Sequence, residues 1–150
     1  MTRPACLLFL AAAIPLTMAF GQPAGMQADE SGNAAIHSLT VETGEFRSVR
    51  GDLYIELSDA LGEVISAEIH PVTGRRMTLT FDSLPSGPRA VRIFHDENSN
   101  GRLDTNLLGI PREGYGFSNN PRSRLGVPAF EDRLFILRSD TTITITLVYW

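Results

Sequence analysis

The 150-residue chain contains no lysine, so all 13 of its basic side chains are arginines. We interpret the absence of lysine as a base-composition bias and not as a feature with a chemical role in the protein. Cysteine is almost absent as well, since Cys6 is the only one and lies close to the N-terminus. A single cysteine excludes an intramolecular disulfide. We therefore expect packing, with help from a bound ion, to stabilise the fold.

Other features that define common function classes are also missing. The formal net charge is −4, which argues against nucleic-acid binding. The chain has no G-x-S-x-G motif and no cysteine nucleophile beyond the N-terminal segment, which argues against the common acyl-transfer enzymes. The apolar run Ala5–Leu16 is too short to span a bilayer comfortably, so we expect no transmembrane segment in the mature chain.

The N-terminal residues have the pattern of a secretory signal peptide. Arg3 supplies positive charge, Ala5–Leu16 an apolar stretch, and Ala19-Phe20-Gly21 a cleavage site with small residues. We predict a signal peptide over residues 1–21, a flexible leader over 22–35 and one folded domain over 36–150. The mature protein is then secreted, to the periplasm or the extracellular space.

From residue 36 onward, apolar and polar residues alternate along short segments. Leu53, Ile55 and Leu57 alternate with polar neighbours, and Ile143, Ile145 and Leu147 repeat the pattern near the end of the chain. Alternation of this kind is typical of strands that bury one face. About seven such segments, separated by turn residues, predict an all-β fold, an antiparallel β-sandwich. The segment 105–129 is rich in glycine and proline, and we predict it to be one long loop.

The segment after the strand-like run Ala90–Phe94 has the spacing of a calcium loop. Asp96, Asn98, Asn100 and Asp104 occupy positions one, three, five and nine of D-x-N-x-N-G-x-x-D. Arg102 would offer its backbone carbonyl at position seven, and Gly101 stands where such a loop turns sharply. Ca²⁺ takes six to eight hard oxygen ligands, which alternate side chains of a tight loop can supply. We therefore predict a Ca²⁺ site at Asp96, Asn98, Asn100, Arg102 and Asp104.

This loop departs from a complete EF-hand. Position twelve is Leu107 in place of a bidentate glutamate, and no helices flank the loop. Two carboxylates give little charge, so we expect a weak site with a Kd of about 10⁻⁴ to 10⁻³ M. The competing interpretation is a polar turn whose Asn and Asp side chains bond only their own backbone.

Several of these residues also resemble an uncharacterised family of secreted bacterial proteins, domain of unknown function 2141. The resemblance lies in 84–87, in the run 90–106 with its D-E-N-x-N-G-R-L-D core, and in 109–120, which contains Gly114-Tyr115-Gly116-Phe117. It extends over roughly 39–149. The resemblance implies an exported domain with a transthyretin-like or immunoglobulin-like sandwich and no assigned activity.

Three functional hypotheses follow. The first is a non-enzymatic binding or structural module that recognises a protein or carbohydrate ligand at the cell envelope, with Tyr115, Phe117, Asn119 and Arg122 as ligand-binding residues. The second is a periplasmic hydrolase or carbohydrate-processing enzyme that uses His95 and Asp96. The third is a small outer-membrane β-barrel, suggested by the alternation up to Tyr149 and Trp150. We favour the first, with no catalytic residue.

Overall fold

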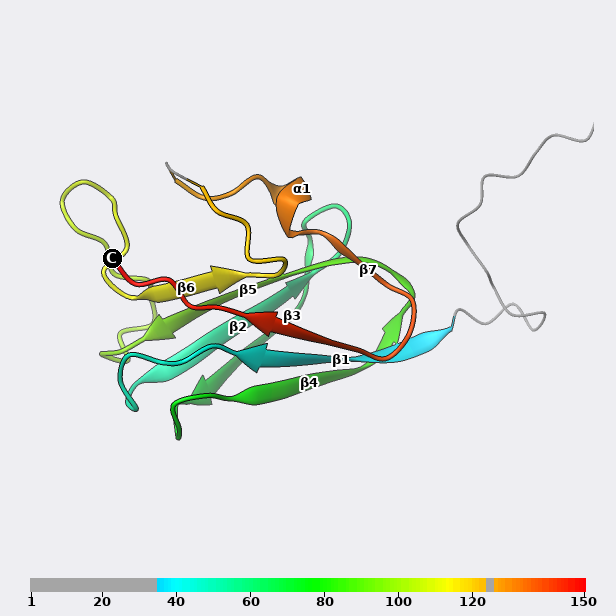
Figure 1. Ribbon diagram of the computed structural model, residues 1–150, viewed down its shortest axis with the longest axis horizontal. Coiled ribbons are helices and arrows are strands. Elements are labelled where there is room, and N and C mark those ends of the chain that lie inside the picture. The colour runs from blue at the N-terminus through cyan, green and yellow to red at the C-terminus, as the bar shows by residue number, and fades with distance from the viewer. Residues whose placement is uncertain (1–34, 124–125) are drawn as a thin grey trace, which may run out of the picture.

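The computed structural model describes residues 35–123 and 126–150, which form two β-sheets packed face to face (Figure 1). The predicted signal peptide and nearly all of the predicted leader lie outside the described residues. The elements are β1 (Ile36–Thr43), β2 (Asp52–Ser58), β3 (Val64–Pro71), β4 (Thr78–Pro85), β5 (Gly87–Asp96), β6 (Gly114–Phe117), α1 (Phe130–Arg133), β7 (Phe135–Leu137) and β8 (Thr141–Ile145). In the described ranges, no helix is long and apolar enough to cross a membrane.

The smaller sheet has the strand order β4-β1-β8, and the larger has the order β3-β2-β5-β6, with β7 paired to the start of β5. All pairings are antiparallel except β1 with β8, which run parallel. The predicted all-β sandwich is therefore confirmed. The parallel pairing is an addition, because alternation shows which side chains face inward but not the direction of a neighbouring strand.

The core lies between the two sheets and is built from the alternating apolar residues. Leu53 and Ile55 of β2 and Ile93 of β5 face Leu39 and Val41 of β1, and all five are buried. Burial of each such side chain contributes about 1.5–3 kcal/mol. Packing of this kind stabilises a chain whose folded part has no disulfide.

The segment 105–129 is not one loop, as the sequence suggested, because it contains β6. This strand pairs with the second half of β5, and Tyr115 lies opposite Phe94. Glycine weakens strand signals in a sequence, but here the glycines are needed for close packing. A Cβ atom at Gly116 would lie 2.7 Å from Ile145 Cγ2 and 2.8 Å from the Thr146 carbonyl oxygen.

The alternation near the end of the chain continues to Tyr149 and predicts a strand up to that residue, but the observed strand β8 ends at Ile145. Beyond Ile145 the chain leaves the smaller sheet and reaches β6 in the larger one. There Tyr115 and Val148 exchange two backbone hydrogen bonds of 3.1 and 2.8 Å. The C-terminal segment therefore closes one end of the sandwich and packs against the glycines of β6 (Figure 1).

Candidate functional site

The predicted cation loop leaves β5 at Asp96 and turns sharply at Gly101, which has a φ of +81°. The Asp96 side chain is fully buried. Its Oδ1 accepts a hydrogen bond from the Asn100 backbone N–H (3.1 Å), and its Oδ2 accepts one from the Gly101 N–H (2.7 Å). Asp96 thus shapes the loop by capping two backbone donors.

Three of the predicted ligands lie together on the other side of the loop. The amide nitrogen of Asn98 donates to Asp104 Oδ2 (2.8 Å), and that of Asn100 donates to Asp104 Oδ1 (3.1 Å). These hydrogen bonds lower the pKa of the Asp104 carboxyl, and the one from Asn100 has the largest effect. The Arg102 side chain points to solvent, with its Nε 3.8 Å from Asp104 Oδ1.

The amide oxygens of the two asparagines are also engaged. Asn98 Oδ1 accepts a hydrogen bond from the Asn100 N–H, and Asn100 Oδ1 accepts one from the Arg102 N–H, both at 3.1 Å. A cation beside Asp104 would therefore require both amides to turn their oxygens inward. Among the described residues, no group of three or more His, Cys, Asp or Glu side chains is placed to hold a metal. The donors suit only a hard, weakly held ion.

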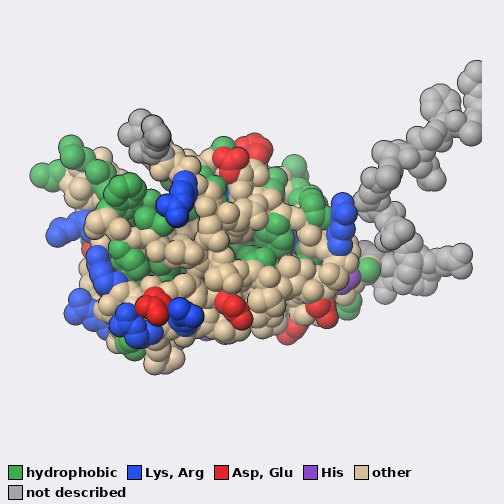
Figure 2. All heavy atoms as spheres, in the orientation of Figure 1, with side chains coloured by type: hydrophobic (Ala, Val, Ile, Leu, Met, Phe, Trp, Pro, Cys, Tyr) green, Lys and Arg blue, Asp and Glu red, His purple; other side chains and the backbone are tan. Residues whose placement is uncertain are grey.

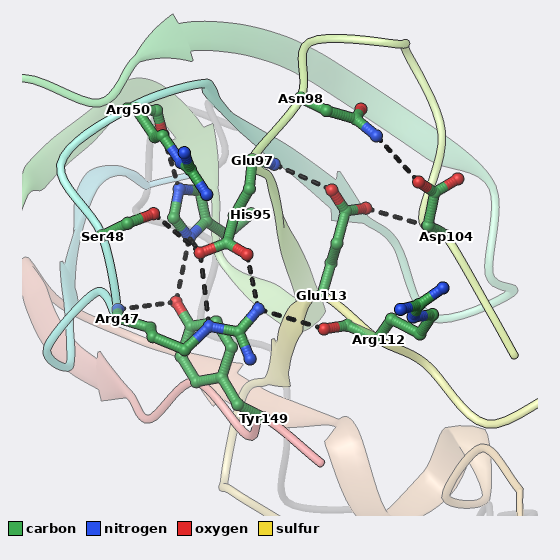
Figure 3. A network of polar contacts seen from close by, with 10 residues as sticks. All are labelled: Arg47, Ser48, Arg50, His95, Glu97, Asn98, Asp104, Arg112, Glu113 and Tyr149. Carbon is green, nitrogen blue, oxygen red and sulfur yellow. Dashed lines mark hydrogen bonds and ion pairs between the residues drawn. The ribbon is translucent and has the colours of Figure 1, made fainter.

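Glu113 anchors this loop, although no sequence motif pointed to it. Its carboxylate is buried, with Oε1 accepting from the Glu97 backbone N–H and Oε2 from the Asp104 N–H, both at 2.9 Å. Figure 3 shows Glu113 between the two ends of the loop. One carboxylate thus fixes both the start and the end of the segment that carries Asn98 and Asn100. Contacts between residues so far apart in the chain leave no local signal in the sequence.

His95 belongs to a second, adjoining network and is completely buried (Figure 3). Its Nε2 lies 2.7 Å from the Arg50 carbonyl oxygen, which can only accept, so Nε2 carries a proton. Nδ1 then accepts from the Tyr149 hydroxyl (2.9 Å), whose pKa is raised by burial. Both ring nitrogens of His95 are therefore engaged, and a substrate would have to displace protein groups to reach them.

Glu97 turns away from the cation loop and toward Arg47. The Arg47 guanidinium pairs with this carboxylate, and the Ser48 hydroxyl donates to it at 2.7 Å. The hydrogen bond from Arg47 is the main reason that the pKa of Glu97 is lowered, and it raises the pKa of Arg47. Arg47 also lies over the Tyr149 ring, with Cζ 4.7 Å from its centroid. The network ties the end of β5 to the segment after β1 and to the C-terminal segment.

The four predicted ligand-binding residues do not form one site. Tyr115 and Phe117 lie on the outer face of β6, where they line a groove. The Asn119 amide nitrogen instead donates to the carbonyl oxygens of Asp132 (3.2 Å) and Leu134 (2.8 Å), so it holds a turn in place. Arg122 is exposed and does not line this groove.

The groove lies on the outer face of the larger sheet and has a volume of about 830 Å³. Its floor is formed by Tyr54 of β2, Phe94 of β5 and Tyr115 of β6, which lie side by side in register on neighbouring strands. Trp150 lies at one end and donates from Nε1 to the Tyr115 hydroxyl (3.0 Å). The walls include the apolar residues Leu103, Leu108, Ile110, Pro111 and Val127.

A known protein family matches most of the chain. The profile of a family described as "Uncharacterized protein conserved in bacteria (DUF2141)" matches residues 41–145. The chain belongs to this family. The matched residues include β2 to β7, the Asp96–Asp104 loop and Glu113. No curated protein and no solved structure matches the chain.

Proposed function

We propose that this family member works outside the cytoplasm as a non-enzymatic recognition module. The sandwich is the scaffold, the groove over β2, β5 and β6 is the recognition surface, and the Asp96–Asp104 loop is a weak site for a Ca²⁺-like ion. The observation that carries the proposal is the groove. Its volume and its apolar, aromatic lining are those of a ligand site, and it lies on a sheet face that would otherwise be polar.

The cation site would serve the groove by stiffening one of its walls. Leu103 and the run 108–111 line that wall, within and shortly after the loop. The wall is held at its two ends by Glu113 and by the hydrogen bond from the Arg112 N–H to the Asp104 carbonyl oxygen (2.8 Å). An ion bound to Asp104 and the two asparagine oxygens would add a third restraint beside these two.

The hydrolase hypothesis has less support from the geometry. His95 and Asp96 are both fully buried, and the polar atoms that a reaction would need are bonded to backbone groups or to Tyr149. The groove, in contrast, is open to solvent and is lined by neither residue.

Thermal unfolding with and without calcium tests the proposed cation site. At 10 mM Ca²⁺ and the expected Kd, binding to the folded state stabilises it by roughly 1.4–2.7 kcal/mol relative to EDTA. We therefore expect the melting temperature to rise by several degrees in the native protein. Asp104→Ala should abolish the rise, because Asp104 is the carboxylate that the asparagines face.

Asp82→Ala, which removes an exposed carboxylate from β4, is the matched control and should keep the rise. Asp104 is preferred to the buried Asp96 for this test, because its side chain is partly exposed and its loss should not prevent folding. An equal melting temperature in calcium and in EDTA would reduce the loop to a polar turn.

A further inference from the structure

The outer face of the larger sheet carries a row of large apolar side chains across all four strands. Ile69 of β3, Tyr54 of β2, Phe94 of β5 and Tyr115 of β6 lie side by side in register. Ile69 is 58 % exposed. An outward face of an antiparallel sheet is normally polar, and a continuous apolar surface of this kind marks a binding site.

The outward-facing side of strand β3, at the edge of the sheet, is also apolar. Its inward-facing positions are polar, and Glu68 there binds His70 at 2.7 Å. Its outward-facing positions include Ile69, which continues the apolar row, and Ala67, which lies opposite Glu56. The usual pattern of apolar inside and polar outside is therefore reversed in β3. The reversal extends the apolar surface from the groove toward the edge of the sheet.

The aromatic rings of the floor stand upright. Tyr54 and Phe94 lie on neighbouring strands and stack with centroids 4.4 Å apart and planes 12° apart. Rings that stack along the direction across the strands must present their edges, not their faces, to the groove. A sugar ring, which packs on an aromatic face, gains little from such a floor, whereas a flexible hydrocarbon chain can lie across the ring edges.

The charged residues that line the groove favour an anion. Glu56, Arg92, Arg102 and Arg133 are the charged residues that line it. Glu56 is neutralised by Arg92, which binds both of its carboxylate oxygens. The lining therefore has a formal excess of positive charge, although the whole chain has a net charge of −4.

Arg133 is the cation best placed to meet a ligand. Its guanidinium lies between the rings of Phe117 and Phe130, with Cζ 5.1 Å from each centroid. Among the described residues it forms no ion pair, and its partial burial lowers its pKa. A half-buried guanidinium stacked on aromatic rings is well suited to hold a carboxylate or a similar group.

We propose that the groove binds a small amphiphilic anion, free in solution and not part of a bilayer. Its hydrocarbon body lies along Tyr54, Phe94 and Tyr115 beneath Leu108, and its anionic group contacts Arg133. Arg133 lies over the ring of Phe117, which is two residues beyond Tyr115 on β6. The hydrocarbon body and the anionic group would therefore be about 7 Å apart along the strand. This inference rests on the recognition role proposed above and does not depend on the cation.

Trp150, the only tryptophan, lines the groove and reports on its contents. The full chain is titrated with monomeric dodecanoate while Trp150 fluorescence is followed. We expect a saturable change with dodecanoate, and none with acetate, with dodecyltrimethylammonium or with a neutral oligosaccharide such as maltohexaose. Arg133→Gln should weaken dodecanoate binding at least tenfold, whereas Arg138→Gln, at an exposed position outside the groove, should not.

Leu108→Asn is a second test that does not challenge folding, because this side chain is 84 % exposed on the groove wall. It should also weaken dodecanoate. Equal binding of dodecanoate and dodecyltrimethylammonium, binding of maltohexaose alone, or binding only to anionic phospholipid vesicles would overturn the proposal. So would the absence of any saturable change.

The dodecanoate titrations are run in EDTA, because calcium precipitates dodecanoate, and the melting temperature with and without calcium is measured separately. If the protein binds dodecanoate but its melting temperature does not change with calcium, the proposed ligand is supported and the proposed cation site is contradicted. A calcium-dependent melting temperature without dodecanoate binding would do the reverse, so the two failures are distinguishable.

Discussion

Glu113 connects two backbone amides, those of Glu97 and Asp104, through separate oxygens of one buried carboxylate. A carboxylate suits this position because it can accept at both oxygens, whereas an amide can accept at only one. The Asp96–Asp104 loop was recognisable in the sequence because its spacing is local, whereas Glu113 and Arg47 were not, because their contacts cross between distant segments. Asp96 both marks the loop in the sequence and shapes it, whereas Glu113, which joins the two ends of the loop, belongs to no local motif.

Glu113→Gln tests the role of this carboxylate. One of the two backbone N–H groups would then face an amide nitrogen and lose its acceptor, at a cost of about 1–3 kcal/mol in the free energy of unfolding. Urea denaturation of the variant beside Glu131→Gln, which changes an exposed carboxylate, measures this cost. Equal stability of the two variants would show that Glu113 does not hold the loop.

Glu97 predicts a specific pH dependence. Its pKa is lowered in the folded protein below the ordinary value of 4.5, so the ionised carboxylate favours folding above that value. This contribution is lost as the pH falls through the lowered pKa. At pH 7, Glu97→Gln should reduce the free energy of unfolding by roughly 1–2 kcal/mol, since Arg47 is half exposed and partly screened.

As the pH falls below 4.5 and through the lowered pKa of Glu97, the difference between the wild type and Glu97→Gln should shrink, because both then carry an uncharged side chain at position 97. Urea unfolding at several pH values measures it, and Glu63→Gln controls for the loss of one exposed carboxylate. A difference that stays constant with pH would show that the ion pair with Arg47 contributes nothing.

Among the elements, β6 shows best where sequence patterns succeed and where they fail. Strands such as β2 and β5 were predictable because alternating Leu, Ile and Val residues face one core. β6 was hidden because its inward positions are glycines, Gly114 and Gly116, placed there to admit the C-terminal segment. The groove was hidden for a related reason, since Tyr54, Phe94 and Tyr115 meet only after three strands have paired.

Gly116→Ala tests the close packing of β6. The added methyl group would lie 2.7 Å from Ile145 Cγ2 and 2.8 Å from the Thr146 carbonyl oxygen, so the C-terminal segment must shift. We expect destabilisation of about 1–3 kcal/mol, measured by thermal or urea unfolding. Gly74→Ala is the matched control, because its methyl group would lie in ordinary contact, 3.5 Å from the Arg76 carbonyl oxygen. Equal effects of the two substitutions would contradict this packing.

At the scale of the whole molecule, the 97–113 segment and the C-terminus lie at the same end of the sandwich (Figure 1). Hydrophobic and arginine side chains gather on the surface at that end (Figure 2), and residues of both segments line the groove. The buried hydrogen bonds of His95 and Glu113 connect this end to the core. The remaining strands supply the scaffold.

We propose that a cation at the Asp96–Asp104 loop orders the wall of the groove. Hydrogen–deuterium exchange of the full chain in EDTA and in 10 mM Ca²⁺ is the measurement to make for this cation, because exchange reports the local opening of each segment. Calcium should slow exchange in residues 97–113 and leave β1 to β4 nearly unchanged, and Asp104→Ala should remove the difference. Identical exchange in EDTA and in calcium, or slowing spread evenly over the chain, would mean that no bound cation orders this wall.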